Sequence, residues 1–299
     1  MAYSYHVVDV FTQVPFEGNA LAVFPDASGL DTEAMQTIAR ELNLSETSFI
    51  FPSESREGST RVRIFTPASE MEFAGHPTIG TAFVMRATGI VPRTARSFAL
   101  QENVGIVPVR VDGGDEPLIW LTTPPIHDLG RFDRKQCAAA ISLQEDDLIP
   151  GVPCDLLSAG NPCIYVALRD KATVDRAAID TTAFYGLIRG RNELACVFVF
   201  TPTSEGAYSR MFAPEYGIVE DPATGSATGP LAAFMMRNNL VSKSDGTAFV
   251  SEQGTKMKRR SLLHVLVHGE NGSNGIEVGG HVTPVATATL SLGAPAVIQ

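Results

Sequence analysis

Short apolar runs and one clear helical pattern alternate along the first half of the chain. The runs have the length and composition of β-strands. They cover residues 5–11, 20–24, 47–51, 61–65 and 105–111. From Met35 to Leu42, apolar side chains recur at i, i+3, i+4 and i+7 behind Asp31 as a candidate N-cap, which predicts an amphipathic helix. A second, more apolar helix is expected over residues 78–85, and strands around such a helix indicate a mixed α+β domain.

Three features of the first half return in the same order in the second half. They are Gly-Asn before an apolar strand (18–19 and 160–161), Arg-x-Phe-x-Pro (63–67 and 210–214), and a glycine-rich turn leading into an apolar helix that ends in Met-Arg (75–86 and 225–237). The shared order and similar gaps indicate that one supersecondary unit has been duplicated. We therefore expect an α+β fold of two pseudo-symmetric domains, each a mixed sheet wrapped around a central helix, with the second helix over residues 229–236.

A Pro-Pro pair separates the two halves. Pro124-Pro125 is a strong chain breaker, so we place the N-terminal half in residues 1–126 and the C-terminal half in residues 127–284. A last apolar strand is expected to return to the first domain, which would then include residues 285–299. The length of 299 residues is about twice that of an ordinary domain and agrees with this division.

Charge and composition narrow the possible partners. The formal net charge is -10 and the densest basic stretch, 256–260, is short enough to be a solvated loop, so we expect no nucleic-acid partner. No apolar run approaches the roughly 20 residues of a membrane span, and the first residues lack a signal-peptide pattern, so we expect no membrane association. The four cysteines form no C-x-x-C pair and a chain of this size needs no disulfide, which indicates a reducing cytoplasm.

The two glycine-rich turns are the best candidates for a binding site. Pro77 suits a first helical position and disfavours helical geometry at His76, so free backbone N–H groups are expected behind Gly75. Small residues around Gly225 expose backbone donors ahead of the second helix in the same way. Because helix N-termini bind anions, two facing turns would hold the carboxylate of a small-molecule substrate and stabilise an enolate formed from it.

Glu46 is placed where such chemistry needs a base. It lies between the end of the first predicted helix, near residue 43, and the strand that follows. A side chain at such a junction can project into a cleft, where burial would raise its pKa toward the working pH. Taken alone, Glu46 is more simply interpreted as an ordinary surface carboxylate beside a helix end.

These segments together resemble the phenazine-biosynthesis isomerase (PhzF-like) family, which has the diaminopimelate epimerase-like fold. The matching stretches span essentially the whole chain in the family's order and are Gly18-Asn19-Ala20, Leu44-Ser45-Glu46-Thr47, Phe73-Ala74-Gly75-His76-Pro77-Thr78, Phe212-Ala213-Pro214 and Glu220-Asp221-Pro222-Ala223-Thr224-Gly225-Ser226-Ala227. The resemblance implies an active site between two similar domains, a homodimer, and no metal or organic cofactor.

The resemblance also assigns roles to particular residues. Glu46 matches the family's general acid/base, and His76 and Asp221 match the residues that flank it. The candidates for substrate contact are Gly75, Gly225, Ser226, Asn19 and Ser45. Simpler interpretations stay open, because Gly18-Asn19 and Asp221-Pro222 are also ordinary turn sequences and Ser226 also suits a helix cap.

Two stretches depart from the related sequences. Where related epimerases place a cysteine on each side of the substrate, this chain has Ala74 and Pro222, which argues against a two-thiol racemase. Late in the chain, Met257-Lys258-Arg259-Arg260-Ser261 replaces the family pattern Met-Gly-Arg-Pro-Ser. An effect of this change on substrate choice or on dimer contacts stays open.

Other sequence patterns lack an essential part. The spacing from Gly75 to Thr81 is that of a phosphate loop without its lysine, and Thr224 stands where a nucleophile elbow needs its first glycine. His264 and His268 flank a strand-like segment that would hold them about 13 Å apart, so we expect no metal site.

The combined expectation is a cofactor-independent isomerase. The family's named activity is isomerisation of trans-2,3-dihydro-3-hydroxyanthranilate, in which a glutamate moves a proton between carbons. We expect Glu46 to do this on a small carboxylate-bearing substrate, for example a cyclic amino-hydroxy acid. The alternatives are a racemase or epimerase that uses Glu46 and Asp221 as opposed acids, and a non-catalytic protein that binds small acids.

Overall fold

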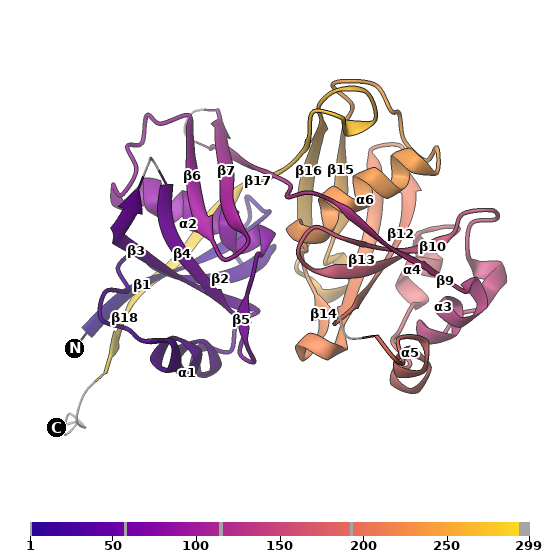
Figure 1. The fold of residues 1–299 in the computed structure, drawn as a ribbon, viewed down its shortest axis with the longest axis horizontal. Helices are drawn as coiled ribbons and strands as arrows, with labels where there is room; N and C mark the ends of the chain where they lie inside the picture. Colours follow the sequence, from indigo (N-terminus) through magenta and orange to yellow (C-terminus); the bar gives the residue numbers. More distant parts are fainter. Residues whose placement is uncertain (1, 57–58, 114–115, 192–193, 293–299) are drawn as a thin grey trace.

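The chain forms two lobes that lie side by side (Figure 1). The computed structural model describes residues 2–56, 59–113, 116–191 and 194–292. Residues 293–299, the end of the segment expected to join the first domain, lie outside the described residues. Among the described helices, none is both long and apolar enough to cross a bilayer.

Each lobe is built mainly from strands. The N-terminal lobe contains β1 (Ala2–Val10), β2 (Asn19–Phe24), α1 (Thr32–Leu42), β3 (Glu46–Arg56), β4 (Ser59–Phe65), β5 (Glu70–Met71), α2 (Gly75–Thr88), β6 (Ser97–Glu102), β7 (Gly105–Asp112) and β8 (Leu118–Thr122). The C-terminal lobe contains β9 (His127–Phe132), α3 (Arg134–Ala140), β10 (Cys154–Ser158), β11 (Pro162–Ala167), α4 (Lys171–Arg176), α5 (Thr181–Leu187), β12 (Cys196–Thr203), β13 (Gly206–Ala213), β14 (Ile218–Asp221), α6 (Gly225–Arg237), β15 (Ala248–Gln253), β16 (Ser261–Val267) and β17 (Ile276–Gly280). The short 3-10 helices are η1 (Glu145–Asp147), η2 (Pro214–Tyr216), η3 (Thr255–Met257) and η4 (Glu270–Gly272).

The two lobes have the same pairing pattern. In the first, β1 and β2 are antiparallel, β3 joins β2 in parallel, and β4 lies antiparallel to β3. In the second, β10, β11, β12 and β13 follow the same scheme. Strands β5 to β8 likewise match β14 to β17. The duplication expected from the three recurring motifs is therefore present in the backbone.

Two pairings join the halves of the sequence. Strands β8 and β17 lie antiparallel to each other, so all described strands belong to one hydrogen-bonded sheet. The last strand, β18 (Val282–Ser291), returns to the first lobe and pairs antiparallel with β1 (Figure 1). In the second lobe, β9 pairs with β10 in the same manner.

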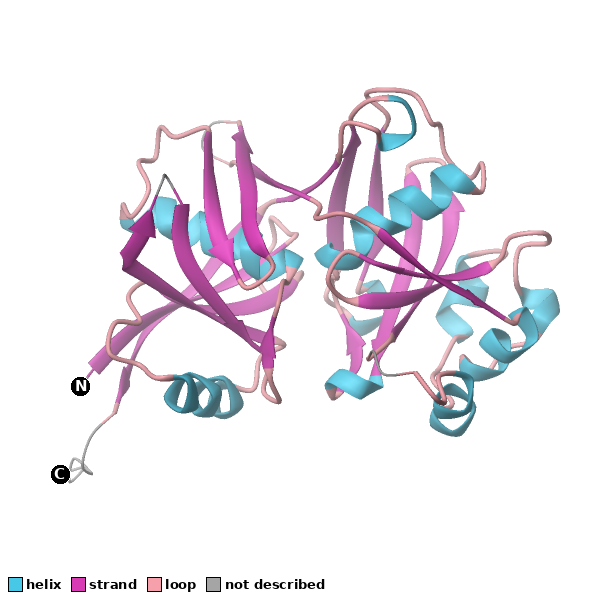
Figure 2. Cartoon of the chain, in the orientation of Figure 1, coloured by secondary structure: helices cyan, strands magenta, loops and turns pink. Residues whose placement is uncertain are grey.

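The two apolar helices are the centres of the lobes (Figure 2). Most residues of α2 and α6 are buried beneath the strands. The expected fold class, two pseudo-symmetric domains with a mixed sheet around a central helix, is confirmed.

Both central helices begin earlier than the sequence predicts. Helix α2 starts at Gly75 instead of residue 78, and α6 starts at Gly225 instead of residue 229. His76 is helical, so the expectation that Pro77 keeps it out of the helix is wrong. Pro77 lies in the first turn, where a backbone N–H has no helical partner, and Pro230 lies inside α6. Burial of both helix starts outweighs the local preference of these prolines.

The recurring arginine has the same structural task in each lobe. Arg63 Nη2 lies 2.6 Å from Glu70 Oε2 in the first lobe, and Arg210 Nη2 lies 2.8 Å from Glu220 Oε2 in the second. The first ion pair links β4 to β5 and the second links β13 to β14, and in each lobe the central helix follows the second of these strands. The amphipathic helix α1 also agrees with its prediction, because Asp31 accepts a hydrogen bond from the Ala34 amide as its N-cap.

Candidate active site

The starts of α2 and α6 meet backbone to backbone between the lobes. A Cβ added to Gly75 would lie 2.6 Å from the carbonyl carbon of Gly225 and 2.6 Å from the nitrogen of Ser226. A Cβ added to Gly225 would lie 3.1 Å from the Cα of Gly75. Only residues without a side chain allow this approach. The expectation that the two helix N-termini face each other is confirmed, and the first two residues of each helix line one pocket.

A pocket lies at this junction, with an empty volume of about 490 Å³ that includes its open mouth. Six of the residues predicted from the sequence line it: Glu46, Gly75, His76, Asp221, Gly225 and Ser226. They come from both lobes, so neither lobe forms the pocket alone.

Two predicted residues lie outside the lining. Asn19 is almost fully buried behind the pocket, where its amide contacts His76 and Asp221. Ser45 lines a neighbouring groove beside Tyr216 and Ile218. Ser45 precedes β3 in a bend and is not part of the pocket that Glu46 lines.

Glu46 is the first residue of β3 and lies opposite Leu21 in the parallel pairing with β2. Burial raises the pKa of Glu46 well above its usual range, and the charge of Asp221 adds to this effect. Its Oε2 lies 3.1 Å from Nε2 of His76. Neither of these two buried atoms makes a directed hydrogen bond to any described residue, so both are open to a partner in the pocket.

His76 is uncharged, because burial lowers its pKa to about 3. The Nδ2 atom of Asn19 lies 3.2 Å from Nδ1 of His76. An amide nitrogen does not accept a hydrogen bond, so a proton on Nδ1 would have no acceptor at Asn19, and the neutral ring carries its proton on Nε2. His76 therefore presents an N–H group toward Glu46 and the pocket.

Asp221 ends β14 and is held by donors on both oxygens. Its Oδ1 accepts from Asn19 Nδ2 at 2.8 Å, and its Oδ2 accepts from Thr224 Oγ1 at 2.5 Å. Burial raises the pKa of Asp221 to about 7, although the bonds from Thr224 and Asn19 act in the opposite direction. Gln253 holds this turn by donating to the Asp221 carbonyl at 2.8 Å and to Thr224 Oγ1 at 2.9 Å.

Asn161 is a pocket residue that the sequence interpretation missed as a functional candidate. Its Nδ2 donates to the carbonyl oxygen of Phe73 at 3.0 Å and lies 3.3 Å from Ser226 Oγ. The recurring Gly-Asn motif was a signal for it, because it makes Asn161 the counterpart of Asn19. Thr224 and Gln253 carried no comparable signal, since their positions depend on the fold of the turn.

The segment that departs from the family pattern ties the lobes together. Arg259 donates from Nη2 to Asp9 Oδ1 at 2.6 Å and to the Glu17 carbonyl at 2.9 Å, and from Nε to the Gly18 carbonyl at 2.8 Å. Arg259, which matches the arginine of the family pattern, thus fixes the turn that leads into Asn19. Lys258, which stands in place of the family's glycine, has a left-handed backbone with φ of 60°.

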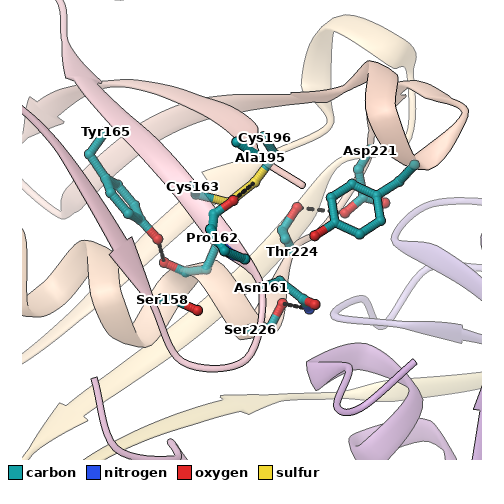
Figure 3. Close-up of a disulfide and its surroundings, with 12 residues drawn as sticks. Ser158, Asn161, Pro162, Cys163, Tyr165, Ala195, Cys196, Asp221, Thr224 and Ser226 are labelled. Atoms are coloured by element: carbon teal, nitrogen blue, oxygen red, sulfur yellow. Dashed lines mark hydrogen bonds between the residues drawn. A yellow bond between two sulfur atoms is a disulfide. The ribbon is translucent and has the colours of Figure 1, made fainter. Parts of the chain in front are cut away.

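Two of the cysteines also line the pocket (Figure 3). Cys163 and Cys196 lie opposite each other in the parallel pair β11–β12 and form a disulfide. The expectation that no cysteine pairs is wrong at this position. No local spacing could indicate it, because 33 positions separate the two residues and the strand register alone brings them together. Cys137 and Cys154 are free and buried.

The histidines excluded as a zinc pair lie as expected. His264 is within strand β16, and His268 follows its end. Within the described ranges, no group of three or more His, Cys, Asp or Glu side chains is arranged to hold a metal ion.

The geometry points to an enzyme that transfers protons. A buried carboxylate, a neutral imidazole and two facing helix N-termini are suited to removing a proton next to a carboxylate. The family model described as phenazine biosynthesis-like protein (PhzC-PhzF) matches residues 8–288. The chain belongs to this family and is an isomerase.

Known relatives resemble the chain over nearly its whole length. A trans-2,3-dihydro-3-hydroxyanthranilate isomerase from Pseudomonas aeruginosa is 33% identical over 282 residues, which are 93% of this chain and 96% of that protein. A phenazine biosynthesis protein of the PhzF family from Bacillus anthracis has a TM-score of 0.87 and 24% identity, covering 98% of this chain and 100% of that one. A Pseudomonas aeruginosa protein described as a predicted epimerase has a TM-score of 0.81 and 32% identity, covering 97% and 100%. The expected family and the diaminopimelate epimerase-like fold are confirmed.

Proposed function

We propose that the protein moves a proton between two carbons of a small carboxylate-bearing substrate, with Glu46 as the general acid/base. The observation that carries this proposal is the pair of buried atoms Glu46 Oε2 and His76 Nε2, which face one pocket without a hydrogen bond from a described residue. In the proposed step, ionised Glu46 takes a proton from a carbon near the substrate carboxylate. The same carboxyl group returns it to another carbon, so no cofactor takes part in the step.

The two helix N-termini supply the electrostatic part of the mechanism. The first-turn amides of α2 and α6 bind the substrate carboxylate and stabilise the negative charge that forms when the carbon loses its proton. The Nε2–H of His76 adds a neutral donor beside Glu46. A neutral donor is useful here, because a charged imidazolium would hold Glu46 in its ionised form and weaken it as a base.

One base explains the site better than two opposed acids. Both oxygens of Asp221 already accept hydrogen bonds from Asn19 and Thr224, whereas Glu46 Oε2 makes no directed hydrogen bond to a described residue. We therefore assign Asp221 to orienting the substrate and to raising the pKa of Glu46. This assignment separates the isomerase from a racemase that would use Glu46 and Asp221 on opposite faces.

The test compares Glu46→Gln with Glu41→Gln, an exposed glutamate of α1. The probe is trans-2,3-dihydro-3-hydroxyanthranilate in D₂O, followed by mass spectrometry and by its conversion. We expect Glu46→Gln to lose turnover and deuterium uptake by about 10²-fold or more while it still binds the probe, and Glu41→Gln to match the wild type. Deuterium uptake that persists in Glu46→Gln would exclude Glu46 as the base. Probe binding without exchange in the wild type would favour the non-catalytic alternative.

A further inference from the structure

Cys196 occupies in the second lobe the position that Glu46 occupies in the first. Glu46 opens β3 and lies opposite Leu21 of β2, two residues after Asn19. Cys196 opens β12 and lies opposite Cys163 of β11, two residues after Asn161. The equivalent strands and the equivalent asparagines give the same register independently. Cys196 is thus the pseudo-two-fold counterpart of the proposed base.

The counterpart faces the same pocket from the other lobe. Glu46 and Cys196 both line it, and the disulfide lies near Asn161, Ser226 and Thr224 (Figure 3). The pocket also contains the buried Glu46 Oε2, which lies 3.1 Å from His76 Nε2 and makes no directed hydrogen bond to a described residue, so a ligand has an acceptor there that does not depend on the cysteines. A substrate held at the helix starts would therefore have a carboxyl group on one face and a sulfur atom on the other.

The surroundings of Cys196 suit a thiol. Its Sγ lies 3.3 Å from the carbonyl oxygen of Pro162, an acceptor to which the S–H group of the reduced residue can donate. No lysine or arginine is part of the described lining of the pocket, so no cation there stabilises a thiolate. The reduced residue is therefore suited to giving a proton rather than taking one.

We propose that Cys196 is a second proton-transfer group of this site and that its disulfide with Cys163 withholds it. The proposal rests on Glu46 being the base. Reduction by a small dithiol breaks the S–S bond and forms two S–H bonds with two electrons and two protons, while the dithiol closes into its own disulfide. The oxidised protein keeps the one-base reaction, and the reduced protein gains a donor on the opposite face.

The proton steps balance in the reduced enzyme. Glu46 takes the substrate proton, and the C–H electron pair stays in the substrate as an enolate. The Cys196 S–H gives its proton to a substrate carbon on the other face, and the S–H electron pair stays on sulfur as a thiolate. The thiolate then gains a proton from solvent and Glu46 releases its proton to solvent, which restores both groups.

A matched pair of variants tests the proposal, because each breaks the disulfide but only one keeps the proposed donor. We expect dithiothreitol to raise the rate of deuterium uptake by trans-2,3-dihydro-3-hydroxyanthranilate about tenfold or more in the wild type. Cys163→Ser should show the high rate without reductant, and Cys196→Ser should stay at the low rate with or without it. Equal rates for the two serine variants would show that the disulfide has only a structural role and would overturn the proposal.

Two measurements keep the outcome separate from the proposed function. Alkylation under denaturing conditions, followed by mass spectrometry, should modify only Cys137 and Cys154 before reduction and all four cysteines after it. Modification of all four without reductant would show that the disulfide does not block Cys196. In folded Cys163→Ser, trans-2,3-dihydro-3-hydroxyanthranilate should protect Cys196 from iodoacetamide. If the enzyme turns this compound over but the compound gives no protection, the Cys196 thiol lies outside the substrate site. If Glu46→Gln stays active, Glu46 is not the base and the proposed function fails. If Glu46→Gln is inactive but Cys163→Ser and Cys196→Ser react at the same rate, only the role of Cys196 fails.

Discussion

Asn19 and Asn161 reach across the lobe junction in opposite directions. Asn19 Nδ2 donates to the carbonyl oxygen of Ala223 at 3.0 Å, and Asn161 Nδ2 donates to the carbonyl oxygen of Phe73 at 3.0 Å. Each acceptor lies two residues before the central helix of the opposite lobe. Each asparagine also contacts the second residue of its own lobe's helix, His76 or Ser226. The duplicated Gly-Asn turn thus fixes the two helix starts against each other.

We expect Asn19→Ala to destabilise the protein by about 1–3 kcal/mol, because the buried Asp221 Oδ1 and the Ala223 carbonyl oxygen both lose the Asn19 donor. The free energy of unfolding from urea titration measures this loss. Asn161→Ala is the matched comparison and should cost less, since its side chain is partly exposed and water can replace it. A larger loss for Asn161→Ala would show that the two turns do not share the junction as described.

Asp221→Asn should change the pH dependence of the reaction. The charge of Asp221 contributes to the raised pKa of Glu46, after the larger effect of burial. Without that charge the pKa of Glu46 falls, so ionised Glu46 becomes available at lower pH. In a plot of kcat/KM against pH, we expect the acid limb of the variant to lie at lower pH than that of the wild type, even if its maximal kcat/KM is lower. An unmoved limb would mean that Asp221 does not influence Glu46.

Glu102 is a buried acid that weakens the fold at high pH. Thr78 Oγ1 lies 2.8 Å from the Ala74 carbonyl and 2.6 Å from Glu102 Oε1, and its single hydrogen cannot serve both acceptors. A protonated Glu102 supplies the missing hydrogen. Burial raises the pKa of Glu102 from 4.5 to about 8, so between these values the folded state keeps a proton that the unfolded state has released. Stability from this group is therefore present below pH 4.5 and is lost as the pH rises to about 8.

Glu102→Gln keeps the shape and the donor at every pH. We expect it to unfold at nearly the same urea concentration as the wild type at pH 5 and to be more stable by over about 1 kcal/mol at pH 8.5. Urea titrations at the two pH values measure the difference. A gain of equal size at both would show that Glu102 does not hold a proton in the folded state.

The sequence predicted the parts of the site that local motifs encode. The glycines at the helix starts and the place of Glu46 between a helix and a strand follow from local patterns, whereas the roles expected of Glu46, His76 and Asp221 came from the resemblance to the family. The pseudo-symmetry followed from the three repeated motifs. Their roles in catalysis stay predictions until Glu46 and its neighbours are tested.

The parts that were missed depend on long-range register. Gln253 reaches the Asp221 turn because β15 returns beside β13, and the Cys163–Cys196 pair depends on the parallel alignment of β11 and β12 across two intervening helices. Helix α6 begins at Gly225, before the predicted start at residue 229, and continues through Pro230, which is unfavourable inside a helix; burial of the whole segment overrides that preference. No local pattern carries this information.

Lys258 and Gly254 provide opposite predictions within one loop. Lys258 is exposed and has a left-handed backbone, a conformation that costs a residue with a side chain about 1–2 kcal/mol. Glycine removes this cost but loses more freedom on folding, so Lys258→Gly should stabilise the protein by about 0.5–1 kcal/mol.

At Gly254 the φ of 75° also favours glycine, and an added Cβ would lie 2.2 Å from the Arg259 carbonyl oxygen. Gly254→Ala should therefore destabilise by more than about 2 kcal/mol. Urea unfolding of both variants measures these changes, and a destabilising Lys258→Gly would mean that the lysine side chain has a stabilising contact in solution.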